Sequence, residues 1–464
     1  MDHSHSHEGL AGGWSRWFSH PALRVLLVAI AAVGVATAVA VVALWPDGSG
    51  RGDVQEQARQ LGLASERFGA AVESVTDGPC SYSTDEAPQQ CRLIVVVPDE
   101  GPDTGLPVTL PEFNTATGNV VPDVSPGDDI VVGYEESTNF YFYADRDRRS
   151  ALTWLLVAFA VVVVALGRWR GVTALASMAL TLVLLIGWVA PGVLDGHDPL
   201  LVSVVAASVI AYTGLYLTHG FSPTTTVALA GTLGALGLTL VIATVFFDAL
   251  RFTGLATEEG LTLPLIAEGI DLTGLLLGGA IIGALGALDD VTVTQVATVG
   301  ELAERNPELG RRELVASGVR VGREHIASTV NTLLLAYVGA SMPLLLLFAV
   351  SDQSLSTVAN SELIAVEIAR TLCGSIGLVA AVPLTTVLAA MVVGGDRTAN
   401  PEDAADIAAD PEPATVPDEP DRDPERAVGD GSAAAVEPEQ HGEDEESRGA
   451  EWTQFAPPDD ADWG

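Results

Sequence analysis

Small and polar residues recur at three- and four-residue steps between Gly279 and Glu301, a spacing that places them on one face of a helix. Glycines at such steps let a neighbouring helix approach closely, so Gly279, Gly283 and Gly286 predict a packing seam. The same face carries a carboxylate, and carboxylates inside a membrane are costly unless they are paired, protonated or hydrated. The face comprises Gly279, Gly283, Gly286, Asp290, Thr294, Ala297 and Glu301.

Asp290 is the candidate with the clearest chemistry, and three roles are open for it. It binds a coupling ion, a proton or a substrate; or it is a hydrogen-bonded structural group of the seam; or it is a boundary charge at a helix end. We expect it to face other protein in the cytoplasmic half of its helix. Asp289 points about 100° away on a regular helix, so the two carboxylates do not form one clamp. Asp289 is itself a further candidate for transport or coupling, and so are Thr294 and Glu301, which share the face of Asp290.

Three other polar residues are candidates for transport or coupling. Asn331 lies at the start of a later apolar run, and Arg323 just before it is the expected counter-charge of Asp290. His219 ends another run, where it acts either as a proton carrier or as an interfacial imidazole held by a backbone carbonyl.

The elements that position these residues are apolar runs of the length that crosses a bilayer, about 20 residues. The first is expected to be an uncleaved anchor, because it is too long for a signal peptide and no small-residue cleavage site closes it. The eight candidate spans are Val25–Leu44, Ala151–Leu166, Val172–Val189, Pro199–Leu217, Thr225–Phe247, Leu272 to about Val296, Thr329–Val350 and Leu372–Val393.

Arginine in short loops predicts the orientation, because cytoplasmic loops are enriched in basic residues. With eight spans, all the Arg-rich loops fall on one side, which places both termini in the cytoplasm. Arg146, Arg148 and Arg149 lie on the other side, where a long translocated domain obeys the rule only weakly. The arginines of the predicted cytoplasmic side are Arg16, Arg24, Arg168, Arg170, Arg305, Arg311, Arg312, Arg320 and Arg323.

Between the first two spans, about a hundred residues predict a small extracytoplasmic domain. Cys91–Val97 and Ser125–Tyr134 have the alternation and turn residues of short strands, whereas Gln55–Val75 has helical spacing. Cys80 and Cys91 are expected to form a disulfide, since the topology places them outside the cytoplasm. A redox or metal pair would favour a tighter spacing.

Composition agrees with a membrane protein, because 48% of the residues are hydrophobic and only 18% are charged. The net charge is −38, and about twenty of the 60 acidic residues follow Gly395 in a Pro- and Ala-rich tail that predicts disorder. His3, His5 and His7 near the N-terminus either bind a divalent cation weakly or belong to a disordered segment. The chain has no P-loop, nucleophile elbow or zinc-protease motif, so we expect no enzyme, no cofactor, no resident metal and no nucleic-acid partner.

The stretch Gly278–Phe348 and the upstream Thr218–Leu236 resemble the YibE/F family of bacterial polytopic membrane proteins. A Gly-rich helix runs into an Asp, followed by a hydroxyl-rich stretch, Glu-Leu and Asn-Pro, and His219-Gly220-Phe221 forms the upstream core. The resemblance covers roughly Tyr134 to Val393 and implies a permease fold without an assigned substrate. Asp289 departs from the family pattern, which usually has an apolar residue there. The matching positions are Gly283, Gly286, Asp290, Thr294, Glu301, Leu302, Asn306 and Pro307.

The sequence therefore predicts an all-α polytopic bundle of about eight transmembrane helices with a small extracytoplasmic β-rich domain and a disordered acidic tail. The leading function is a permease or secondary transporter of a small solute or ion in the bacterial plasma membrane. The alternative is a membrane scaffold or sensor whose outer domain binds a protein partner. The expected divisions are residues 1–22 (cytoplasmic N-terminus), 23–45 (first span), 46–149 (outer domain), 150–394 (seven-helix domain) and 395–464 (tail).

Overall fold

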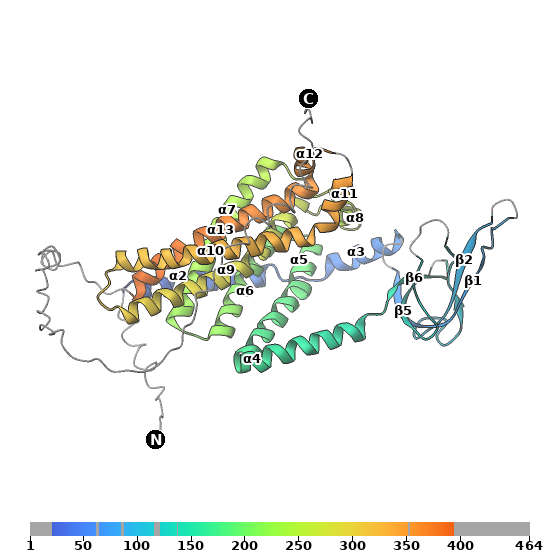
Figure 1. Cartoon of the computed structure of the whole chain (residues 1–464), viewed down its shortest axis with the longest axis horizontal. Coiled ribbons are helices and arrows are strands. Elements are labelled where there is room, and N and C mark those ends of the chain that lie inside the picture. The colour runs from blue at the N-terminus through green and yellow to red at the C-terminus, as the bar shows by residue number, and fades with distance from the viewer. Residues whose placement is uncertain are drawn as a thin grey trace, which may run out of the picture. The chain divides into compact units, whose positions relative to one another are not determined.

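The computed structural model describes residues 21–61, 65–84, 88–115, 121–136, 138–350 and 353–393. The hypotheses about His3, His5 and His7 and about the acidic tail concern residues outside this part of the chain. The described chain is mostly helical, with one small antiparallel β-sheet unit, as expected (Figure 1).

Six of the described helices are long and apolar enough to cross a membrane, or seven if one bent pair counts as a single span. The six are α2 (Pro21–Ala43), the continuous segment of α4 (Arg149–Leu184), η2 (Leu185–Val189) and α5 (Ala190–Leu194), then α6 (Pro199–His219), α7 (Pro223–Leu250), α9 (Leu272–Arg305) and α13 (Glu362–Val393). The shorter helices are α3 (Ser49–Gln60), α8 (Glu258–Ile266) and α12 (Leu355–Asn360).

The continuous segment of α4 and η2 contains both of the apolar runs expected between Ala151 and Val189. Its backbone is non-helical at Arg168, with φ 52° and ψ −129°, so the two runs form separate arms. The arms fold back closely, because a Cβ added to Gly171 would collide with the carbonyl oxygen of Val163. Figure 1 shows the chain reversing its direction near the label of α4.

The bent pair is α10 (Arg311–Ala340) and α11 (Met342–Val350), which meet at 62°. Arg320 and Arg323 were expected in a loop, but they lie within α10, which extends the apolar run by about five turns toward its N-terminus. Similarly, α13 begins at Glu362 and not at Leu372. Both helices are longer than their apolar cores because amphipathic and charged turns continue the same helix.

The centre of the bundle is formed by α7, α9 and α13, which pack against one another, with α6 against α9 and α10 against α13. Glycines allow the close approach: a Cβ on Gly231 of α7 would collide with Thr385, and one on Gly377 of α13 with Thr239. The side chain of Gln295 donates to the Gly318 carbonyl at 2.8 Å and to Thr386 Oγ1 at 2.7 Å, which joins α9, α10 and α13.

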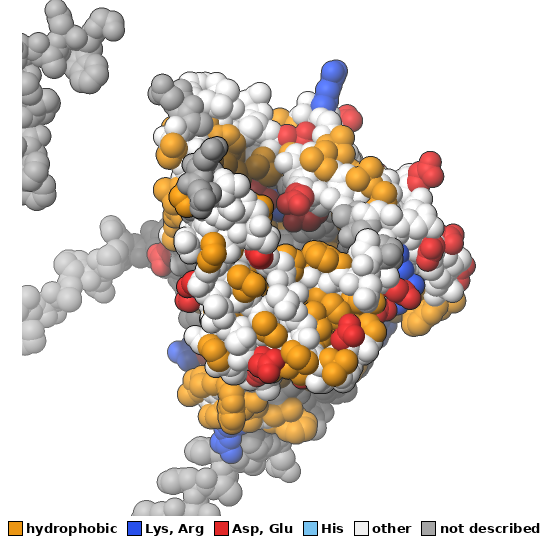
Figure 2. Space-filling model, turned by 90° about the vertical axis from the view of Figure 1, so that its right-hand side faces the viewer, with side chains coloured by type: hydrophobic (Ala, Val, Ile, Leu, Met, Phe, Trp, Pro, Cys, Tyr) orange, Lys and Arg blue, Asp and Glu red, His pale blue; other side chains and the backbone are white. Residues whose placement is uncertain are grey.

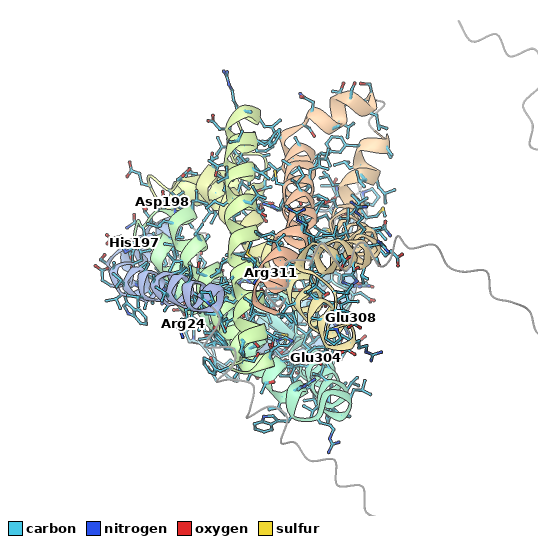
Figure 3. All side chains as sticks on the ribbon, turned by 90° about the vertical axis from the view of Figure 1, so that its left-hand side faces the viewer. Arg24, His197, Asp198, Glu304, Glu308 and Arg311 are labelled. Atoms are coloured by element: carbon cyan, nitrogen blue, oxygen red, sulfur yellow. A yellow bond between two sulfur atoms is a disulfide. The ribbon has the colours of Figure 1, made fainter. Side chains whose placement is uncertain are left out.

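Apolar clusters identify the two ends of the bundle. Leu23 in the first turn of α2 shares a buried cluster with Val299 of α9, Leu314 of α10 and Ala389 of α13. The start of the first membrane helix and the end of the last therefore lie at the same end. Figure 3 views the helices from this side and labels Glu304, Glu308 and Arg311, where α9 is followed by α10.

At the opposite end, Trp188 and Val193 pack with Val202 of α6 and with Leu44, which follows α2. The carboxylate of Asp195 accepts hydrogen bonds from the backbone N–H groups of Gly48 at 2.8 Å and Gly50 at 3.0 Å. This contact holds the start of α3 against the turn between α5 and α6.

The sheet unit has strands β1 (Glu66–Pro79), β2 (Gln90–Pro98), β3 (Val108–Thr109), β4 (Phe113–Asn114), β5 (Asp129–Glu135) and β6 (Phe140–Arg146). They form the order β3-β2-β1-β5-β6, with β4 also paired to β2. The predicted strands at Cys91–Val97 and in Ser125–Tyr134 are confirmed. Alternate residues Ala70, Val72, Ile94, Val96, Ile130 and Val132 are buried in its core.

The interpretation of Gln55–Val75 as helical is wrong beyond Gln60. From Glu66 the chain enters β1, where Ala70 and Val72 are buried with the two-residue period of a strand.

Cys80 and Cys91 form the predicted disulfide, with Cα atoms 4.8 Å apart, beside the β1–β2 pairing. Acidic side chains outnumber basic ones on the face seen in Figure 2, so the negative charge is not confined to the tail.

Candidate functional site

A polar hollow of about 180 Å³ lies between α4, α6 and α9. Helix α4 contributes Ser177, α6 contributes Thr218 and His219 at its last turn, and α9 contributes both Asp289 and Asp290. Two carboxylates, an imidazole and two hydroxyls therefore converge on a small space within the helix bundle. Gly214, Leu215 and Val293 complete its lining.

Asp289 is the inner carboxylate of this hollow. Its Oδ1 atom is buried and has no hydrogen-bond partner among the described residues. Its Oδ2 atom lies 4.0 Å from the position that a Cβ on Gly214 would occupy, so the absence of a side chain there leaves room for the carboxylate. A buried carboxylate oxygen without a hydrogen-bond partner is costly, and the carboxylate is stabilised by taking up a proton or a cation.

A chain of hydroxyl groups fixes the backbone at Asp289. Thr292 Oγ1 donates to the carbonyl oxygen of Asp289 at 3.1 Å, which leaves Thr232 as the donor in the 2.7 Å bond between Thr232 Oγ1 and Thr292 Oγ1. Both threonine side chains are buried. Helix α7 therefore holds α9 in register at the carboxylate.

Asp290 and His219 lie at the exposed rim of the hollow. The Nδ1 atom of His219 is 2.7 Å from Thr218 Oγ1, and the charge of Arg170 lies near the imidazole. His219 also lines a second hollow of about 230 Å³ beside the N-terminus of α7, with Ser222, Thr224 and Thr225. The imidazole thus stands between two polar spaces.

Asp290 was expected to face other protein; its side chain is exposed at the rim of the hollow, and Asp289 is the half-buried member of the pair. The predicted face of α9 does exist, because Gly279, Gly283, Gly286, Asp290, Thr294 and Glu301 are all exposed together. The buried face is turned by roughly one residue and carries Ala284, Leu288, Val291, Thr292 and Gln295.

The packing expected at Gly279, Gly283 and Gly286 is therefore found elsewhere on α9. A Cβ on Gly278 would collide with Ser203 of α6, whereas a Cβ on Gly286 would meet no atom within 4 Å. Only the ends of long side chains, Arg370 Nη2 and Tyr337 Oη, come near the positions above Gly279 and Gly283. The glycines leave an open face because the neighbouring helix backbones lie on the opposite side.

Four other candidates do not join the hollow. Thr294 is exposed and faces away from Asp289, and Glu301 pairs with Arg305 at 2.5 Å on the helix surface. Arg323 and Asn331 are exposed on α10. The described residues contain no ion pair between Arg323 and Asp290. The roles of all these residues remain predictions.

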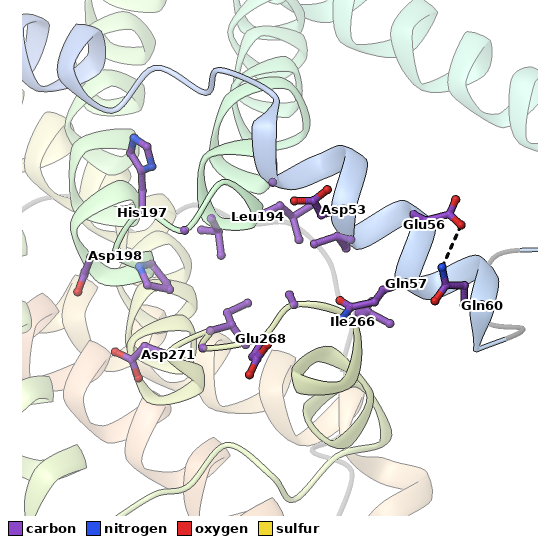
Figure 4. A pocket seen from close by; sticks show the side chains of 18 residues that line it. Asp53, Glu56, Gln57, Gln60, Leu194, His197, Asp198, Ile266, Glu268 and Asp271 are labelled. Carbon is purple, nitrogen blue, oxygen red and sulfur yellow. Dashed lines mark hydrogen bonds between the residues drawn. The ribbon is translucent and has the colours of Figure 1, made fainter.

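A larger hollow of about 760 Å³ lies at the opposite end, between α3, the α5–α6 turn and the segment before α9. Figure 4 shows Asp53 and Glu56 on α3, and Glu268 and Asp271 on the other side. Glu56 accepts a hydrogen bond from Gln60 at 3.1 Å. The carboxylates are exposed, so this hollow attracts cations electrostatically without a desolvated ligand set.

Sequence reasoning missed Ser177, Thr218, Thr232 and Thr292. Hydroxyl residues on α4, α6, α7 and α9 were a weak signal, because Ser and Thr in membrane helices usually bond to their own backbone. Thr218 does this as well, donating to the Gly214 carbonyl at 2.7 Å. The pairing of helices decides which hydroxyls meet, and one sequence does not give that pairing.

The fold and the hollow define the class: a polytopic helical membrane protein with an embedded carboxylate and an accessory sheet unit. The chain belongs to the YibE/F-like protein family, whose model matches residues 155–395. This match confirms the resemblance found in the sequence and covers the helices that form the hollow. No curated protein and no solved structure matches the chain.

Proposed function

We propose that this chain is a secondary transporter of a small solute or ion, coupled to a cation or proton through Asp289. The observation that carries the proposal is the buried Oδ1 atom of Asp289, which has no partner among the described residues and adjoins a polar hollow. A carboxylate that binds and releases a cation needs an oxygen atom without a permanent hydrogen-bond partner, because such a partner would compete with the ion.

The surrounding groups fit this role. The carboxylate of Asp289 and the hydroxyl of Ser177 provide oxygen atoms, which hard cations prefer as ligands, and His219 at the rim is able to carry a proton. Asp290 at the exposed rim attracts cations toward the hollow. The proposal assigns binding and release to these residues and no chemical reaction.

The proposed topology has eight crossings with both termini in the cytoplasm. The segment Arg149–Leu194 has 46 residues, about 69 Å of helix, which is more than twice the hydrocarbon thickness of about 30 Å. Its break at Arg168 supports two crossings in place of one. Together with the bent pair α10–α11, this makes eight. The end of the bundle that contains Arg24, Arg170 and Arg311 is then cytoplasmic, and the disulfide lies on the oxidising side.

Ion flux into liposomes tests the proposal without knowledge of the solute. Purified protein is reconstituted with a pH-sensitive dye inside, and proton and ²²Na⁺ fluxes are measured under imposed gradients. We expect Asp289→Asn to abolish the protein-dependent flux and Asp290→Asn to reduce it only partly. Asp248→Asn, an exposed carboxylate of α7, is the matched control and keeps the flux. Equal flux in the wild type and Asp289→Asn would refute the role of Asp289.

A sensor is the second candidate, and the large outer hollow favours it. The contact of Asp195 with the start of α3 links the hollow to the membrane helices, so ligand binding there would change the position of α5 and α6. A sensor predicts no flux in liposomes, and it predicts cation-dependent protection of α3 from hydrogen exchange that is lost in Asp53→Asn.

A further inference from the structure

An ion pair lies within the last membrane helix, in a position that the sequence did not indicate. Glu367 and Arg370 are one turn apart on α13, and Arg370 Nη1 donates to Glu367 Oε1 at 2.9 Å. The side chain of Arg370 is only 19% exposed. An arginine in this setting needs acceptors for its five N–H groups, because the hydrocarbon chains of lipids supply none.

The Glu367 bond leaves the other edge of the guanidinium unused. Arg370 Nε is buried without a partner, and Nη2 has no hydrogen bond among the described residues. These two nitrogens share one edge of the planar group, so their N–H bonds point the same way and match the two oxygens of a carboxylate or phosphate. A donor that is buried without a partner, as Nε is here, is destabilising until an acceptor reaches it.

The unused edge faces the open glycine face of α9. Arg370 Nη2 is 3.9 Å from the position of a Cβ on Gly279, and no other atom comes within 4 Å of that position. One turn along, Tyr337 Oη is 3.0 Å from the corresponding position on Gly283. The tyrosine hydroxyl also has no hydrogen bond among the described residues. Two unused donors, Arg370 Nη2 and Tyr337 Oη, thus lie above two residues that have no side chain.

We propose that Arg370 and Tyr337 form a binding site for a small oxyanion, a carboxylate or a phosphate, above Gly279 and Gly283. The Nε and Nη2 hydrogens bind two ligand oxygens, and the Tyr337 hydroxyl donates to one of them or to a neighbouring oxygen. Glu367 fixes the guanidinium and lowers the net positive charge, so that the anion is released again readily.

The lining of a neighbouring cavity indicates which oxyanions fit. Tyr337 and Glu367 also border a cavity of about 450 Å³ at the α10–α11 bend, whose other walls are mainly apolar, including Leu334, Val338 and Ile368. Broken helices commonly line substrate sites in transporters. A carboxylate with a short hydrocarbon chain can place its head at Arg370 and its tail in this cavity. Calling this anion the substrate rests on the proposed transport function, whereas the binding site does not.

Equilibrium binding to purified full-length protein in nanodiscs tests the site. The probes are radiolabelled octanoate and inorganic phosphate, each with the wild type, Arg370→Lys and Gly279→Leu. Lysine keeps the charge but has no two-nitrogen edge, and leucine fills the space beside the guanidinium while the arginine itself is kept. We expect each change to weaken binding at least tenfold. Gly286→Leu, on the same face with no atom within 4 Å, is the matched control and should stay within twofold of the wild type.

The outcomes separate the possible ligands and the two proposals. Octanoate binding without phosphate binding supports the site and identifies a carboxylate with a tail, and phosphate binding without octanoate binding supports it for a free inorganic anion. If octanoate uptake is the same in Arg370→Lys, in Gly279→Leu and in the wild type, the octanoate is partitioning into the lipid. That result, together with no phosphate binding, would overturn the proposed site. Asp289→Asn should bind the oxyanion normally. Loss of flux in that variant with intact binding would therefore bear on the transport function and not on the oxyanion site.

Discussion

The hydroxyl groups of Thr232 on α7 and Thr292 on α9 lie 2.7 Å apart in the buried centre of the membrane domain. The Thr292 hydroxyl donates a hydrogen bond to the carbonyl oxygen of Asp289. Through Thr292, the Thr232 side chain on α7 therefore positions the turn of α9 that carries the carboxylate. A one-turn slip of either helix would break this contact. The coupling candidate is thus positioned by a neutral polar contact between helices.

Replacing Thr292 by Val should lower thermal stability. The change keeps the shape of the side chain but leaves the Thr232 hydroxyl buried without its partner, which costs about 1–3 kcal/mol. We expect a lower midpoint of thermal unfolding in detergent for Thr292→Val. The double variant Thr232→Val with Thr292→Val should recover part of the loss, because neither partner is then left unsatisfied.

The matched control for this pair is Thr244→Val. Thr244 also lies on α7, but it is exposed and donates only to the Leu240 carbonyl of its own helix, at 2.8 Å. Its replacement should change the midpoint little. An equal decrease of the unfolding midpoint in Thr244→Val and Thr292→Val would mean that the contact between helices stabilises the protein no more than a hydroxyl bonded within its own helix.

Reduction of the Cys80–Cys91 disulfide should loosen the sheet unit alone. The bridge closes a short loop, with a sequence separation of 11, and its loss costs roughly 2–3 kcal/mol. Hydrogen exchange of the full-length protein should become faster in peptides from β1 and β2 after reduction. Peptides from α7 provide the internal control. Unchanged exchange in β1 would contradict a stabilising role for the bridge.

The pair of Asp77 and Arg92 predicts a dependence on pH that is confined to acidic conditions. The Arg92 side chain donates to Asp77 at 2.8 Å, and this hydrogen bond lowers the pKa of Asp77 below its usual range. A lowered folded pKa means that the stabilisation is complete above the unfolded pKa and is lost as the pH falls through the folded pKa.

Asp77→Asn should therefore speed hydrogen exchange in β1 slightly at pH 6, and the difference from the wild type should shrink as the pH falls below the usual pKa range of an aspartate. The effect is small because Asp77 is 58% exposed, and solvent screens such pairs. Exchange in the two proteins is compared at each pH separately. A difference that grows as the pH falls would have the wrong sign.

Hydropathy and local patterns predicted the membrane helices, the strands at Cys91 and at Ser125, and the disulfide. These features follow from length, alternation and compartment, which are local properties of the chain. The start of β1 was missed because small residues such as Gly69, Ala70 and Ala71 fit a helix and a strand equally well. The sheet neighbours on both sides decide that segment.

Asp289 and His219 were among the predicted candidates and line the hollow, but the packing face of α9 was predicted about one residue away from where it lies. Periodicity showed that Gly279, Gly283, Gly286 and Asp290 share a face, but it did not show which face of α9 meets α6 and α7. A rotation of about 100° exchanges Asp290 for Asp289. Glu367 and Arg370 were assigned to a loop because charge usually ends an apolar run, whereas here the pair allows the helix to continue.

The break at Arg168 gives a further prediction, which concerns the topology. If α4 crosses the membrane twice, the turn at Arg168 lies in the cytoplasm and the sheet unit lies outside. A cysteine at Gly167 reports on this, because no atom lies within 4 Å of its Cβ position. The background is Cys373→Ser, since Cys80 and Cys91 are bridged and Cys373 is the free thiol of the described chain.

A membrane-impermeant maleimide added to intact cells should leave Gly167→Cys unlabelled and should label it after the membrane is opened. Glu100→Cys, on an exposed turn of the sheet unit, is the control and should be labelled in intact cells. The physical reason is the length of Arg149–Leu194, since 46 residues cross about 30 Å of hydrocarbon twice. A thiol at Gly167 that stays unlabelled in opened membranes would place it in lipid, which contradicts the double crossing. Labelling of both positions in intact cells would place Arg168 outside and reverse the proposed path of α4.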